Sequence, residues 1–151
     1  SSAASDVYKR QAIPTQQAIA RAKQQVASIH LYPGIDKQLL HAAASHRRVL
    51  VIELYHSGTG PADIDSDLLE FIAELKASAS ELQVLMGAFP GQHIALPYQS
   101  TQLLKQAGAK IYADLPAHLL QVFAVFAIAA EMGSADISQA LLPFELESCD
   151  L

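Results

Sequence analysis

The chain has 151 residues, of which 51% are hydrophobic and 17% are charged, and its formal net charge is -5. This length fits one domain, and an acidic chain without a basic patch interleaved with aromatic residues gives no sign of nucleic-acid binding. The single cysteine, Cys149, excludes an internal disulfide and a cysteine-based zinc site.

We interpret residues 1–25 as a tail and linker. Ser1–Gln11 lacks the apolar segment of a signal peptide. The string Ser5–Gln11 resembles a translated sequencing adapter, in which case the natural N-terminal part is missing; an ordinary flexible tail is the alternative. Residues 15–25 are rich in Ala and Gln with few apolar positions, which indicates a loosely packed lead-in to a domain over residues 26–142.

Four strands are predicted in this domain. Val26–Tyr32 alternates apolar and polar residues, as a strand with one buried face does. Val49–Tyr55 opens with four consecutive β-prone apolar residues, which indicates a strand covered on both faces. The other two strands are expected over residues 82–89 and 110–113.

Helices are predicted after each strand. Asp36 is a candidate N-cap for a helix over Lys37–Ser45, with an inner face of Leu39, Leu40 and Ala43. The next helix starts after Asp65 or Ser66 and has an apolar stripe of Leu68, Leu69, Ile72 and Leu75. The later helices are expected over Tyr98–Ala107, closed by Gly108, over Pro116–Met132, stopped by Gly133, and over Ser134–Leu142.

This alternation of strands and helices, at intervals of about 25–30 residues, is typical of βαβ units. It predicts an α/β fold of three layers, with a short, about four-stranded parallel sheet between flanking helices, of the Rossmann or flavodoxin-like kind. Residues 143–151 are expected to form a loose acidic tail. Because ligands of such sheets bind outside the carboxyl ends of the strands, the candidate loops are residues 32–35, 55–61, 88–92 and 114–116.

The loop Tyr55–Pro61 is the richest of these candidates. Gly58 and Gly60 allow backbone N–H groups to approach a ligand, Ser57 and Thr59 add hydroxyls, and His56 is a candidate base. A simple turn from strand to helix explains the same glycines, and the residues alone favour that interpretation. No Lys-Ser or Lys-Thr follows, so the loop is not a P-loop.

Metal and cofactor sites are not expected. The histidines lack zinc-protease spacing, and the alternating Asp63, Asp65 and Asp67 lack the rest of a calcium loop, so helix capping explains them better. The apolar stretch Leu119–Met132 is shorter than the roughly 20 residues that span a bilayer, so we expect no membrane partner. We expect this stretch to be buried or to face a second copy of the chain.

Four motifs occur in an order and at a spacing that resemble those of a known family. They are Leu31-Tyr32-Pro33-Gly34-Ile35, the loop Tyr55–Pro61, Pro97-Tyr98, and Ala107-Gly108 followed by Asp114-Leu115-Pro116. In order and spacing, over Ser28–Met132, they resemble the C-terminal domain of bacterial cytoplasmic-type (type I) L-asparaginases. That family has Tyr-Pro-Gly-Ile after the first strand of the domain and Tyr-Gly-x-Gly-Asn-x-Pro after the second.

The resemblance implies an amidohydrolase. In that family an N-terminal domain supplies a nucleophilic Thr and a Thr-Asp-Lys set, which hydrolyse the side-chain amide of Asn to Asp and ammonia through an acyl-enzyme. No Thr-Gly-Gly-Thr motif occurs here, so no catalytic residue is assigned and the chain is expected to be inactive alone. The implied partners are the N-terminal domain of the parent chain and further copies in a homo-oligomer, and the implied location is cytoplasmic.

The same resemblance implies weak substrate binding by Tyr55, Ser57, Gly58 and Thr59, lent to a neighbouring subunit. Thr59 stands where the family has Asn, and Met86-Gly87-Ala88 stands where it has Thr-Gln-Cys. These departures leave an alternative open, a divergent non-catalytic module for ligand binding or oligomerisation. A receiver domain is disfavoured because His30-Leu31-Tyr32 carries no acidic cluster.

Overall fold

The structure, a computed structural model, describes residues 13–32, 34–54, 66–88 and 98–146. The helices are α2 (Gln16–Lys23), α3 (Lys37–Ala44), α4 (Ser66–Ala77), α5 (Tyr98–Gln106), α6 (Ala117–Ala129), α7 (Ser134–Leu141) and the short 3-10 helix η1 (Leu142–Phe144). The strands are β1 (Val26–His30), β2 (Val49–Glu53), β3 (Gln83–Ala88) and β4 (Lys110–Pro116).

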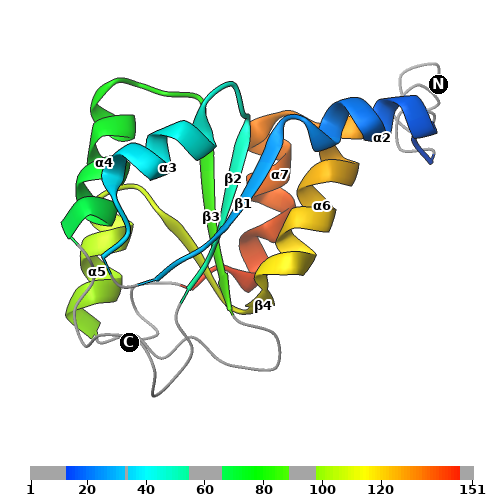
Figure 1. Cartoon of the computed structure of the whole chain (residues 1–151). Coiled ribbons are helices and arrows are strands. Elements are labelled where there is room, and N and C mark those ends of the chain that lie inside the picture. Colours follow the sequence, from blue (N-terminus) through cyan, green and yellow to red (C-terminus); the bar gives the residue numbers. More distant parts are fainter. Residues whose placement is uncertain (1–12, 33, 55–65, 89–97, 147–151) are drawn as a thin grey trace.

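The four strands form one parallel sheet in the order β1-β2-β3-β4. Helices α3, α4 and α5 cover one face of the sheet, and α2, α6 and α7 cover the other (Figure 1). The predicted three-layer α/β fold is therefore confirmed. Because all four strands are parallel, their carboxyl ends lie along one edge.

Each face of the sheet has its own hydrophobic core. Val49 and Val51 of β2 belong to the cluster under α6, and Leu50 and Ile52 belong to the cluster under α3 and α4. All four side chains are fully buried. The prediction of a strand covered on both faces is thus confirmed, and β2 joins the two cores through the sheet.

Helix α6 contacts all four strands, and its first turn approaches β3 very closely. A Cβ atom on Gly87 would lie 2.7 Å from Cδ1 of Leu120 and 2.9 Å from both N and Cα of Ala117. Two of these three atoms are backbone atoms, which cannot rotate away. Glycine at position 87 is therefore required for α6 to lie where it does.

The ends of the long apolar helix differ from the prediction. Strand β4 continues to Pro116, which is the N-cap of α6 rather than a residue of its first turn. At the other end, Glu131 adopts a left-handed conformation with φ 65°, and the N–H groups of Glu131 and Met132 bond to the carbonyls of Ile128 and Ala127. This Schellman motif ends α6 at Ala129, four residues before Gly133, which instead is the N-cap of α7.

The same motif ends α5 as predicted. Gly108 has φ 107°, its N–H bonds to the carbonyl of Lys105, and the N–H of Ala109 bonds to that of Leu104. Within α3, the predicted cap Asp36 accepts from the N–H of Gln38 at 2.6 Å. The predicted inner face is correct for Leu40 and wrong for Leu39, which is 46% exposed.

Two segments expected to be loose are packed on the domain. Helix α2 lies against α6, with Ala22 buried, so part of residues 1–25 belongs to the fold. In the expected tail, the N–H of Leu146 bonds to the carbonyl of Ile111 at 2.7 Å, and its side chain joins the core. The prediction of a loose tail from Pro143 is therefore wrong for residues 143–146.

We expect Gly87→Ala to lower the free energy of unfolding by about 1–3 kcal/mol, because the added methyl group overpacks the contact between α6 and β3. Urea denaturation followed by circular dichroism measures this loss. Gly133→Ala is the matched control, since its added Cβ would meet only Oδ2 of Asp136, at 3.7 Å. An equal loss in both variants would contradict the close approach at Gly87.

Candidate functional site

The carboxyl edge of the sheet is where the sequence places the candidate loops. The predicted binding residues Tyr55, Ser57, Gly58 and Thr59, together with His56, lie outside the described residues, as do residues 89–92. Tyr32 of the first loop is 44% exposed, whereas Ile35 is buried in the core. The structure therefore describes the strand and the helix on either side of the main candidate loop, and not the loop itself.

Both ends of that loop are anchored. On the strand side, Leu54 is fully buried and its N–H bonds to the carbonyl of Gly87 at 3.0 Å. On the helix side, Oδ2 of Asp67 in the first turn of α4 accepts from the backbone N–H of Lys37 at 2.9 Å. Asp67 thereby joins the start of α4 to the start of α3, as a capping residue across two helices.

An exposed charge network continues this junction along α3 and α4. Nζ of Lys37 lies 2.8 Å from Glu74 and 3.3 Å from Glu70, and Nε2 of His41 lies 2.8 Å from Glu74. The hydrogen bond to Glu74, followed by that to Glu70, raises the pKa of Lys37. The hydrogen bonds from Lys37 and then His41 lower the pKa of Glu74. These ion pairs and hydrogen bonds join α3 to α4. We therefore assign this network a structural role rather than a role in chemistry at the carboxyl edge.

A second histidine–glutamate pair lies at the carboxyl edge itself. His30 and Glu53 are the last residues of β1 and β2, they face each other in the register, and Nδ1 of His30 is hydrogen-bonded to Oε1 of Glu53. Their side chains are 60% and 19% exposed. The sequence analysis missed this pair, because 23 residues separate the two positions. Aligning the two predicted strands in a parallel register is the signal that finds it.

The end of β4 also has an irregular register at this edge. Gly87 pairs with Tyr112, but the next residue of β3, Ala88, pairs with Pro116, so residues 113–115 bulge out of the ladder. Asp114 is exposed in this bulge. Bulges of this kind redirect side chains and are common beside binding sites. The predicted loop 114–116 is therefore a bulged strand end.

Tyr112 illustrates how apolar the adjoining interior is. Its side chain is fully buried, and its hydroxyl has no hydrogen-bond partner. Burial, followed by the negative charge of Glu145, raises the pKa of Tyr112. A phenol that stays protonated in an apolar core has a structural role, not an acid–base role.

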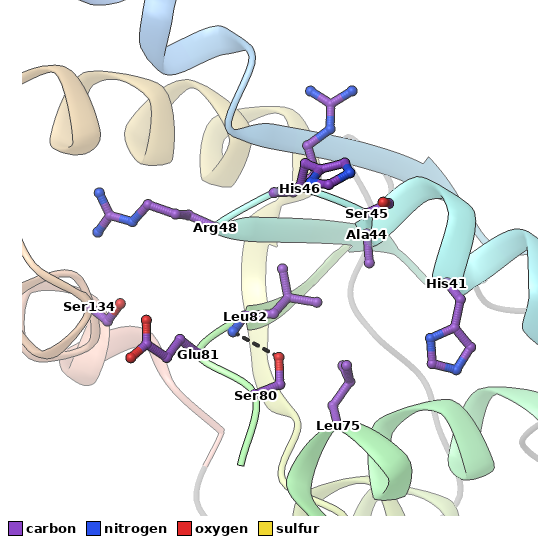
Figure 2. Close-up of a pocket in the computed structure, with 11 residues that line it drawn as sticks. His41, Ala44, Ser45, His46, Arg48, Leu75, Ser80, Glu81, Leu82 and Ser134 are labelled. Atoms are coloured by element: carbon purple, nitrogen blue, oxygen red, sulfur yellow. Dashed lines mark hydrogen bonds between the residues drawn. The ribbon is translucent and has the colours of Figure 1, made fainter. Parts of the chain in front are cut away.

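A pocket of about 450 Å³ lies at the opposite, amino edge of the sheet. It is lined by residues 44–48 before β2, by residues 80–82 before β3, and by His41, Leu75 and Ser134. Figure 2 shows Arg48 and His41 on opposite sides of this pocket, so its cationic groups do not converge. Arg48 donates to the carbonyl of Met132 at 3.2 Å, and His41 is held by Glu74. The arrangement does not form an anion site.

Metal and membrane features were also sought in the described parts of the chain. There, no three His, Cys, Asp or Glu side chains come together in a way that would hold a metal ion. No helix of these residues is long and apolar enough to cross a bilayer.

Two L-asparaginases are among the solved structures with a similar fold. L-asparaginase I from Vibrio cholerae aligns with a TM-score of 0.61 at 12% identity, over 78% of this chain and 35% of that chain. The thermostable L-asparaginase from Thermococcus kodakarensis aligns with a TM-score of 0.55 at 20% identity, over 82% of this chain and 36% of that chain. No family model and no curated protein matches the sequence.

This chain therefore spans about a third of the length of the asparaginases it matches. At these identities the likeness shows a shared fold. It agrees with the resemblance of the four sequence motifs to the C-terminal domain of that family, and the fold of the described residues is that of part of an L-asparaginase.

Proposed function

We propose that this chain is the C-terminal domain of an asparaginase-family amidohydrolase, whose parent protein hydrolyses the side-chain amide of L-asparagine to L-aspartate and ammonia. The observation that carries the proposal is the likeness of the fold to two L-asparaginases over about four fifths of this chain. Fold alone does not define chemistry, so the motif residues and their positions supply the remaining support.

Those motif residues lie where elements begin and end. Tyr32 and Ile35 lie between β1 and α3, and Asp114 and Pro116 lie in the bulged end of β4. These are connecting positions, where binding residues concentrate in α/β folds. Because the motif residues occupy such positions, their resemblance to the asparaginase family is better explained by a shared function than by shared packing alone.

The proposed division of labour assigns the nucleophile to the N-terminal catalytic domain of the parent. This chain contributes weak substrate binding through Tyr55, Ser57, Gly58 and Thr59, lent to a neighbouring subunit. The parent is proposed to act in the cytoplasm, without a cofactor. Thr59 replaces the Asn expected in this loop, and a threonine hydroxyl offers one donor where a carboxamide offers two.

A homo-oligomer is part of the proposal because of the outer face of α6. Leu119, Val122 and Phe126 are 49%, 51% and 45% exposed, and their spacing places them on one side of the helix. Helix α6 has no charged side chain except that of His118 when protonated, so this face has little to keep it in water. Contact with a second copy would bury it.

The isolated chain is expected to release no ammonia from L-asparagine or L-glutamine, because the proposed nucleophile belongs to another domain. A coupled glutamate dehydrogenase assay at high protein concentration measures this. Turnover by the purified chain that persists after a second chromatographic step would show that a complete site exists within these residues.

A chimera tests the proposed function directly. The matching part of the Thermococcus kodakarensis enzyme is replaced by residues 15–146 of this chain, with either Thr59 or Thr59→Asn. We expect Thr59→Asn to raise ammonia release about tenfold or more, since a carboxamide adds a well-placed hydrogen bond to the substrate.

Ala62→Asn, just after the loop Tyr55–Pro61, is the matched control for that chimera and should leave the rate unchanged. If the Thr59 chimera and the Thr59→Asn chimera both fold and neither releases ammonia, the amidohydrolase proposal fails. The non-catalytic module for ligand binding or oligomerisation is then the function that remains.

Self-association is tested by replacing Leu119, Val122 and Phe126 with serine. We expect the unsubstituted chain to form dimers or larger species in sedimentation velocity. The triple variant should be monomeric, because it lacks the apolar face. A control variant changes Leu39 and Leu103, which are similarly exposed on the other face of the sheet. If the unsubstituted chain stays monomeric at high concentration, the proposal of a homo-oligomer is contradicted.

A further inference from the structure

The two outer strands of the sheet, β1 and β4, differ in how their free edges are guarded (Figure 1). On β4, residues 113–115 bulge out of the ladder, Lys110 adds a charge, and the N–H of Leu146 bonds to the outward carbonyl of Ile111 at 2.7 Å. Bulges, charges and covering segments are the means by which proteins keep a sheet edge from pairing with another chain. Strand β1 has a regular register throughout and contains no proline, glycine, lysine or acidic residue.

The outward backbone groups of β1 include those of Val26 and Ser28. On the inner side, the N–H of Leu31 and the carbonyl of Gln25 bond to β2 at 2.9 and 3.2 Å. Because backbone groups alternate in direction along a strand, the N–H and carbonyl groups of Val26 and Ser28 point away from β2. Within the described residues these groups have no hydrogen-bond partner, and the side chain of Ser28 is exposed. A second strand can therefore pair with this edge.

The occupant that fits this edge is a second copy of β1. In an antiparallel pair, each hydrogen-bonded residue exchanges both of its N–H···O=C bonds with the residue opposite. An edge that presents a donor and an acceptor on the same residue is therefore its own complement about a two-fold axis, which is the commonest symmetry of soluble oligomers. Ala27 and Ile29 pack against the core and are only partly buried, so a further strand would also cover apolar surface.

The charges at the two ends of β1 favour the antiparallel direction. At the amino end, Lys23 and Arg47 are exposed, and Arg47 donates to the carbonyl of Gln24 at 2.5 Å. Neither cation has a carboxylate partner in the described part of the chain. At the carboxyl end lie the acidic side chains of Asp36, which caps α3, and Glu53, which ends β2. An antiparallel pair brings the cations of each copy toward the acidic end of the other, twice by symmetry.

We propose that β1 pairs antiparallel with β1 of a second copy of this chain, so that the two sheets join into one continuous sheet. The backbone groups of Val26 and Ser28 form part of the new ladder. Because β1 has five residues, the contact alone is weak, with a dissociation constant on the order of 0.1–1 mM. It involves no residue of the outer face of α6 and requires no amide hydrolysis, so its test is independent of those of the proposed function.

Amide hydrogen exchange of the full 151-residue chain tests the pairing. It is measured by NMR at micromolar and near-millimolar concentrations, in a variant that also carries serine at Leu119, Val122 and Phe126. This variant is expected to be monomeric at the lower concentration and to pair through β1 at the higher one. There, the amide of Ser28 should exchange about threefold more slowly, because it gains an acceptor. The amide of Leu31, already bonded to β2, is the internal control. Exchange at Ser28 that does not depend on concentration overturns the proposal.

Two substitutions at one position, made in the same background, separate the edge from the rest of the surface. Ser28→Pro removes the outward N–H and no bond to β2, so it should raise the dissociation constant about tenfold or more, as measured by NMR diffusion. Ser28→Ala keeps that N–H and should leave association unchanged.

Ser28→Lys covers the case in which the proline variant does not fold. It leaves the backbone intact and adds like charges to the contact, so it should also weaken association. A folded Ser28→Pro variant that associates as well as Ser28→Ala overturns the proposal. So does a Ser28→Lys variant that associates as well as Ser28→Ala when the proline variant is unfolded.

Discussion

The close approach of α6 to β3 at Gly87 is the constraint on which one whole layer of the molecule depends. Because Ala117 and Leu120 occupy the space of a side chain at position 87, α6 can reach all four strands, and α2 and α7 pack beside it. The same contact sets the carboxyl edge, since Gly87 also accepts from the N–H of Leu54 and pairs with Glu53. It further shows that position 87 faces α6, so a ligand-facing side chain at this point is incompatible with the observed packing.

The layers of the fold were predictable because strong local signals agreed with one another. Four consecutive β-prone residues from Val49 identify the central strand, and Gly108 marks the end of α5 by the one conformation that glycine adopts easily. The end of α6 was mispredicted because Glu131 adopts that left-handed conformation at an energetic cost that its neighbours offset. Sequence favoured Gly133 there, and only the contacts of the folded chain determine that a glutamate takes the position instead.

The sequence predicts which edge of the sheet carries the candidate site, but not which residues form it. The rule that ligands bind at carboxyl ends points to one edge of the sheet, but which residue pairs with His30 depends on how β1 and β2 align. The two histidine–glutamate pairs, 23 and 33 residues apart, are equivalent in sequence terms. They differ in whether a lysine shares the carboxylate, which follows from the packing of α3 on α4.

A shared fold and a shared chemistry are separate properties of this chain. The scaffold of this chain is similar to that of two L-asparaginases over about four fifths of its length. Chemistry depends instead on a few side chains at the carboxyl edge, and those change without cost to the cores on either face of β2.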